Sequence, residues 1–187
     1  MRGRLNPVLT LAAALALAAG AHVPAQAGEL FGGVYTNRVD TGVAVCCAES
    51  GADIELGYRT EPLKGLARLG DWRLYALASA NTSGGVDFAA AGIAWRLHLT
   101  KRVYAQAGIG GAVQDGPASQ TPGPKKQLYL GSRFLFEPEA TVGIVLTPRW
   151  AAEASYLHLS HGYLAGKNNP GLDDVGVRVV YRFGGQG

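Results

Sequence analysis

"DDVGVRVVYRF", residues 173–183, is the stretch that says most about the fold of this chain. Alternate positions carry one apolar set: Val175, Val177, Val179, Tyr181 and Phe183. The positions between them carry a mixed set: Asp174, Gly176, Arg178, Val180 and Arg182. Because successive side chains of a strand point to opposite faces, this pattern predicts a strand. In a soluble sandwich the apolar face would enter the core, whereas in an outer-membrane barrel it would meet lipid and the arginines would face a polar lumen.

The same alternation recurs along the chain, in segments of about ten residues bounded by turn-forming residues. The eight segments are 29–36, 52–60, 72–80, 86–97, 103–113, 128–146 with a break near Pro138, 150–160 and 173–183. None of them has a helical apolar stripe, and only residues 61–70 could form one helical turn. The chain is therefore predicted to be all-β.

Four features favour a membrane barrel over a secreted β-sandwich, which is the alternative. The number of segments is even, each is long enough to cross a bilayer with tilt, and the last one resembles the closing strand of bacterial outer-membrane barrels. With both ends periplasmic, the outward loops are 37–51, 81–85, 114–127 and 161–172, and the inward turns are 61–71, 98–102 and 147–149. Long outward loops and short inward turns, with one exception at 61–71, are typical of such barrels. We predict an eight-stranded antiparallel transmembrane β-barrel in the outer membrane.

The N-terminus has the features of a secretory signal. Arg2 and Arg4 precede an apolar run at residues 8–20, and "AHVPAQA" at 21–27 contains an A-x-A cleavage pattern. The run is too short to remain as a membrane-spanning helix. We predict a signal peptide at residues 1–27, a barrel at residues 28–187, and a location in the bacterial outer membrane after cleavage.

Composition excludes several classes of function. The net charge of +3 is too small to indicate nucleic-acid binding. Cys46 and Cys47 are adjacent, so they cannot build a disulfide framework. No set of His, Cys and Asp residues has the spacing of metal ligands, so neither a metal nor a cofactor is predicted.

A polar group interrupts the apolar face at the outer end of the last hairpin. His158 and Ser160 share the lipid-facing side of one strand, and Asp173 has the same parity at the start of the next. Strand pairing would bring the three together, and such a set can hydrolyse an acyl ester. Strand ends near lipid headgroups are often polar without a catalytic role, and spacing alone leaves both interpretations open. Asp174 is the competing acid, but its parity points it into the lumen.

The stretch "HLSHGYLAGKNNPGLDDVGVRVVYRF", residues 158–183, resembles the C-terminal part of the lipid A 3-O-deacylase (PagL-type) family. Members of this family are eight-stranded outer-membrane barrels that act as serine hydrolases. The resemblance implies that His158 is the base, Ser160 the nucleophile and Asp173 the acid. It also implies that Asn169 donates to the oxyanion, aided by a backbone N–H of residues 162–163; an ordinary turn role for Asn169 is the alternative. Two positions depart from the family pattern: His161 replaces Asn, and Asp173 replaces the more familiar Glu.

These observations predict an outer-membrane esterase that removes an ester-linked acyl chain from lipid A or a related outer-leaflet glycolipid, and the resemblance implies the 3-O position. The rival interpretation is a non-enzymatic structural or adhesive barrel with a polar rim. The implied partners are a lipopolysaccharide-like glycolipid and the outer membrane, with no nucleic acid. The sequence leaves the oligomeric state open, a homodimer included.

Overall fold

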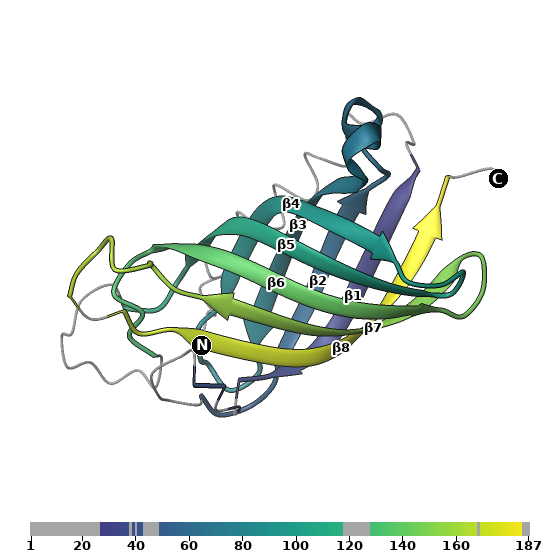
Figure 1. Cartoon of the computed structure of the whole chain (residues 1–187). Coiled ribbons are helices and arrows are strands. Elements are labelled where there is room, and N and C mark those ends of the chain that lie inside the picture. Colours follow the sequence, from purple (N-terminus) through teal and green to yellow (C-terminus); the bar gives the residue numbers. More distant parts are fainter. Residues whose placement is uncertain are drawn as a thin grey trace.

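In the described part of the chain, eight antiparallel strands close into one barrel, each paired with its neighbours in chain order and β8 paired with β1 (Figure 1). This is a computed structural model, and it describes residues 27–37, 39, 41–42, 49–117, 128–167 and 169–184. The strands are β1 (Gly28–Thr36), β2 (Asp53–Thr60), β3 (Asp71–Asn81), β4 (Phe88–His98), β5 (Val103–Gln114), β6 (Phe134–Val145), β7 (Trp150–Leu159) and β8 (Leu172–Phe183). The predicted fold is confirmed. Cys46, Cys47 and the predicted signal peptide, apart from Ala27, lie outside the described residues.

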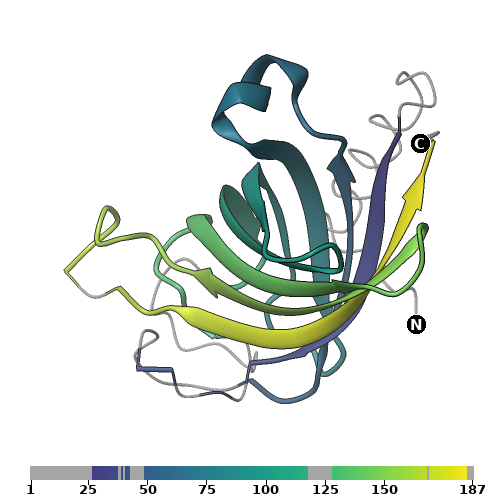
Figure 2. The ribbon, with the colours of Figure 1, turned by 45° about the vertical axis from the view of Figure 1, so that its right-hand side comes forward.

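The loops differ between the two ends of the barrel. One end, called the long-loop end below, carries the connections 37–52, 82–87, 115–133 and 160–171. The other end carries 61–70, 99–102 and 146–149. The predicted turn of helix is a 3₁₀ helix, η1 (Lys64–Leu69), and it projects from the end opposite the β7–β8 loop (Figures 1 and 2). Among the described residues, no helix combines the length and the apolar character that crossing a membrane requires.

Strand β6 differs from its prediction. It begins at Phe134 rather than at residue 128, and it runs through Pro138 without a break. Pro138 pairs with Ile109 of β5. On the other side, the continuous ladder with β7 includes only residues from Glu139 onward. Before Pro138, one isolated bridge joins Phe136 to Ser160. Because proline has no N–H, it weakens one ladder without ending the strand.

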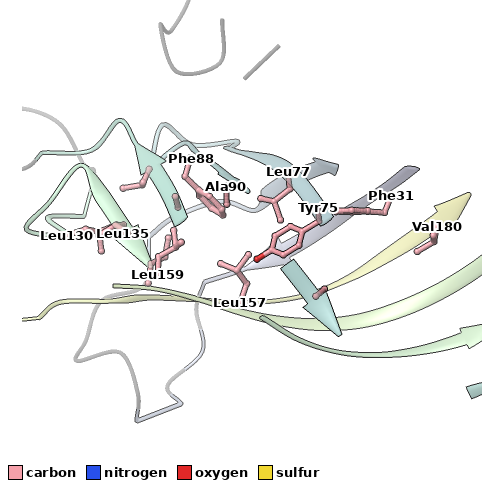
Figure 3. Packing of buried hydrophobic residues seen from close by; sticks show 14 of the residues in the cluster. Phe31, Tyr75, Leu77, Phe88, Ala90, Leu130, Leu135, Leu157, Leu159 and Val180 are labelled. Atoms are coloured by element: carbon pink, nitrogen blue, oxygen red, sulfur yellow. The ribbon is translucent and has the colours of Figure 1, made fainter. Parts of the chain in front are cut away.

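Side-chain facing follows the predicted parity. On β8, Val177 is 66% exposed on the outer wall, whereas Arg178 and Val180 are buried inside. On β7, Leu157 and Leu159 point into the barrel and pack in one apolar cluster with Leu135 (Figure 3). The even-numbered residues of β7 therefore face outward, including His158.

Paired charges fill the middle of the barrel. Three distances define the network: Arg178 Nη2 to Glu139 Oε1, 2.8 Å; Arg59 Nη1 to Glu29 Oε2, 2.9 Å; and Arg96 Nη2 to Glu29 Oε2, 2.8 Å. Glu153 also bonds Arg59, with Nη1 to Oε1 at 3.1 Å. Buried charges are tolerated when each has an opposite partner and hydrogen bonds, as here. The filled interior means that a site for a lipid must be sought on the outer wall.

Candidate active site

The β7–β8 hairpin joins two polar side chains on the outer wall near the long-loop end. In its register, His158 lies directly across from Asp173, and Leu157 lies across from Asp174. His158 Nδ1 and Asp173 Oδ1 are 2.6 Å apart. With Asp173 ionised, its carboxylate can only accept hydrogen bonds, and Nδ1 then carries the imidazole proton. The two residues therefore form a histidine–carboxylate pair.

This pair is buried although it lies on an outward face. His158 is 8% exposed and Asp173 is 2% exposed, in contrast to the outward-facing Val177 on the same strand as Asp173. Asp174, the competing acid, is buried on the inner side, and its Oδ1 has no hydrogen-bond partner among the described residues. The hairpin register thus separates the two neighbouring aspartates onto opposite sides of the wall.

Ser160 follows His158 by two residues and is also 8% exposed. Its backbone is fixed by the bridge to β6, in which Phe136 N donates to Ser160 O at 2.7 Å and Ser160 N donates to Phe136 O at 3.2 Å. A Cβ atom built on Gly171 would lie 3.3 Å from His158 Nε2, so the Nε2 edge of the ring faces the β7–β8 loop. Since Nδ1 is occupied by Asp173, Nε2 is the nitrogen that can take a proton from a serine.

Two hydroxyl groups complete the surroundings of Asp173. Tyr156 donates its hydroxyl to Asp173 Oδ1 at 2.9 Å, and Thr41 of the β1–β2 connection donates to Asp173 Oδ2. Tyr156 has the same parity as His158 on β7, so its direction follows from the sequence, but no sequence pattern assigned a role to its hydroxyl. Thr41 carried no signal, because it is 132 positions from Asp173 in the chain.

The β7–β8 loop contains the residues suggested for an oxyanion site. Gly162 and Tyr163 both have left-handed backbones, with φ of 58° and 63°, so the chain turns sharply just beyond Ser160. The Asn169 Oδ1 atom is buried and has no hydrogen-bond partner among the described residues. His161 is buried, and its Nδ1 accepts from Ala165 N at 3.3 Å, which makes it a residue that stabilises this turn.

A buried carboxylate holds the neighbouring loops together. Glu49 accepts backbone N–H groups of Val86 at 2.8 Å and Leu128 at 2.6 Å, and so links the β1–β2, β3–β4 and β5–β6 connections. Burial raises the pKa of Glu49, against the lowering effect of these two hydrogen bonds. Across the described ranges, no three His, Cys, Asp or Glu side chains are grouped so that they could hold a metal ion.

Comparisons with known proteins agree with this architecture. The crystal structure of the outer membrane enzyme PagL is similar, with a TM-score of 0.57 and 16% identity over 83% of this chain and 98% of that one. A de novo designed transmembrane β-barrel is also similar, with a TM-score of 0.50 and 12% identity over 86% of this chain and 98% of that one. At such identities these likenesses speak for the fold alone. No curated protein matches the sequence.

Comparison of the sequence with protein families gives stronger evidence of relationship than these structural likenesses do. A family model described as lipid A 3-O-deacylase (PagL) matches residues 52–182, a range that includes His158, Ser160 and Asp173. The match extends over well more than half of the chain and covers seven of its strands in whole or nearly so. This chain belongs to the lipid A 3-O-deacylase (PagL) family.

Proposed function

We propose that this protein is an outer-membrane esterase that hydrolyses the 3-O-linked acyl chain of lipid A, or of a closely related outer-leaflet glycolipid, with Ser160, His158 and Asp173. The observation that carries the proposal is the 2.6 Å contact between His158 Nδ1 and Asp173 Oδ1 on the outer wall, two residues from Ser160. Membership of the family supports the same reaction.

The reaction would proceed in two halves. Ser160 Oγ attacks the ester carbonyl carbon while His158 Nε2 takes the hydroxyl proton, and Asp173 stabilises the resulting imidazolium. The tetrahedral intermediate collapses, His158 returns the proton to the departing sugar oxygen, and the acyl group stays on Ser160. Water then attacks the acyl-enzyme with His158 again acting as base, and the fatty acid leaves while Ser160 regains its proton.

Charge that develops on the carbonyl oxygen needs hydrogen-bond donors. The Asn169 side-chain amide and a backbone N–H of the Gly162–Tyr163 turn are the donors that we propose for this role. Both belong to the loop that follows Ser160, and the left-handed turn brings the chain back sharply beyond the nucleophile. In the proposed orientation this loop lies on the outer side of the membrane, at the level of lipid headgroups.

The surroundings of Ser160 suit an acyl chain. Its bridge partner Phe136 is 46% exposed on the same outward face, and Phe134 on that face is 75% exposed. Below the site, the outward residues of β8 are three valines followed by Tyr181 and Phe183, and the barrel interior contains ion pairs. An apolar wall beside a buried histidine–carboxylate pair and a nearby serine suits a substrate with an ester bond and long acyl chains.

Mass spectrometry of lipid A tests the function. The protein would be expressed in a bacterium whose lipid A carries its 3-O-acyl chains, with Ser160→Ala as the matched control. Loss of one hydroxyacyl mass with the wild type, and no loss with Ser160→Ala, is the expected result. Unchanged lipid A in the presence of correctly folded wild-type barrel would instead favour the rival, a non-enzymatic structural or adhesive barrel.

A further inference from the structure

The Asp173 carboxylate accepts hydrogen bonds at both of its oxygen atoms. Oδ1 receives His158 Nδ1 at 2.6 Å and the Tyr156 hydroxyl at 2.9 Å, while Oδ2 receives the Thr41 hydroxyl. We propose that Tyr156 and Thr41 are positioning residues for the reaction, which hold the Asp173 carboxylate against His158. This inference rests on the proposed function and adds two residues to it.

An aspartate at this position needs such support. Its side chain is one methylene shorter than that of glutamate, so its carboxylate must be turned toward the imidazole across the hairpin, where directly paired Cβ atoms are about 4.5–5.5 Å apart. Asp173 is 2% exposed, so water cannot satisfy its second oxygen. A buried carboxylate is strongly disfavoured unless donors surround it. Thr41 supplies a donor to this second oxygen, and Tyr156 supplies a further donor to the oxygen that also bonds His158 Nδ1.

The two hydroxyls come from parts of the chain that are themselves held in place. Tyr156 lies on β7 with Val175 of β8 as its partner, two ladder positions from the His158–Asp173 pair and on the same face. Thr41 belongs to the β1–β2 connection, whose two ends are joined by the hydrogen bond from Glu49 N to Asn37 Oδ1 at 3.0 Å. Thr41 also interacts with the Tyr156 hydroxyl. The carboxylate is therefore held by one strand and one loop.

Tyr156→Phe tests the first residue, because it removes a single oxygen atom. We expect kcat for lipid A deacylation to fall about tenfold with KM unchanged, the size expected for one hydrogen bond to a charged group that acts on the chemical step. The control is Tyr181→Phe, which removes a hydroxyl from the same outward face of the barrel at the opposite end of β8, where the ring packs on Trp150. This control should leave kcat unchanged, and both variants should fold as the wild type does.

Thr41→Val and Thr41→Ser test the second residue. Valine keeps the shape of threonine without its hydroxyl, so kcat should fall, and serine should restore most of the rate that valine loses. In an Asp173→Asn background, adding Tyr156→Phe or Thr41→Val should cost little further, because the group that they position has already been changed. Equal losses in both backgrounds, or wild-type rates for Tyr156→Phe and Thr41→Val, would overturn the proposal.

A measurement that needs no turnover separates this inference from the proposed function. Nitrogen-15 magnetic resonance of histidine-labelled barrel in detergent reports the tautomer of His158, assigned by comparison with His158→Ala. The wild type should hold the proton on Nδ1, and the double variant Tyr156→Phe/Thr41→Val should show a mixture of tautomers. An unchanged tautomer in the double variant contradicts the positioning role. If the tautomer changes in the double variant but the wild-type protein leaves lipid A intact, only the proposed esterase function is contradicted.

Discussion

A Cβ atom added to Gly171 would lie 2.7 Å from His158 Cε1, closer than Cβ atoms are found to approach other heavy atoms. The backbone of the β7–β8 loop therefore lies against the imidazole, and only glycine leaves the ring in place. We expect Gly171→Ala to displace His158 and to lower kcat for lipid A deacylation about 100-fold, since small misplacements of a catalytic group are costly.

The matched control for this change is Gly111→Ala. Gly111 lies on β5, and a Cβ atom there would meet nothing within 4 Å. Deacylation assays on both variants, with folding checked by the shift in gel mobility on heating, should show a loss for Gly171→Ala only. Full activity of Gly171→Ala would mean that the ring can move without harm.

Val179→Arg tests how the outer wall sits in the bilayer. Val179 is exposed on the outer face of β8 and pairs with Gly32 and Ala152, near the middle of the strand. An arginine facing lipid near the midplane should destabilise the inserted barrel by about 2–4 kcal/mol. The free energy of folding into lipid vesicles would be measured beside that of Val179→Leu, which keeps the site apolar. Equal values for the two variants would place this position outside the hydrocarbon region.

The raised pKa of Glu49 leads us to expect that the stability of the loops at the long-loop end depends on pH. Burial raises the pKa of the Glu49 carboxyl above the ordinary 4.5, so the folded loops bind this proton more tightly than the unfolded chain does. The stability that Glu49 contributes is then fully present below about pH 4.5 and is lost as the pH rises through the raised pKa. Limited proteolysis of the wild-type loops should therefore speed up as the pH rises from about 5 to about 8, relative to that of Glu49→Gln, whose side chain does not titrate. A ratio of rates that does not change with pH would contradict this.

The alternation predicted the strands, because both faces of a membrane strand impose a period of two: lipid on one side and packed side chains on the other. The number and length of the segments, the closing strand and the loop lengths then favoured the barrel over a sandwich. The alternation failed at the start of β6, where Leu128 and Leu130 continue the pattern. Leu130 is buried because the β5–β6 connection packs into the apolar cluster at the long-loop end, and Gly131, with a φ of 77°, turns the chain before β6 begins. Periodicity cannot distinguish a strand from a loop that inserts apolar residues into a core.

The candidate site, too, was predicted only in part from the sequence. The contact between His158 and Asp173 follows from parity and from hairpin pairing, both of which are local in sequence. The hydrogen bond from Thr41 to Asp173 exists because β1 pairs with β8 in the closed barrel, which brings the β1–β2 connection beside the start of β8. No pattern within the β1–β2 connection or within β8 encodes this contact. Sequence thus predicted the pair and missed the groups that surround its carboxylate.

The two neighbouring aspartates should differ sharply in their effect on the reaction. Asp173→Asn changes the group that bonds His158 Nδ1, so kcat should fall strongly, by up to about 10⁴-fold if the imidazole adopts the wrong tautomer. Asp174→Asn alters a carboxylate on the inner side of the wall and should leave kcat within about twofold of the wild type. Lipid A deacylation rates of the two purified variants decide between them. A large loss for Asp174→Asn with none for Asp173→Asn would reverse the assignment of the acid.

Ser160→Ala and His158→Ala should each abolish deacylation. Neither residue belongs to the apolar cluster inside the barrel, so the variants should still assemble as barrels. The double variant should be little slower than either single variant, because a nucleophile and its base act as one unit and their losses do not add. Rates for the three variants would be measured on the same lipid A vesicles, with gel mobility before and after heating to confirm folding. Losses that multiply in the double variant would mean that the two residues act independently, and full activity of Ser160→Ala would exclude a serine nucleophile at this position.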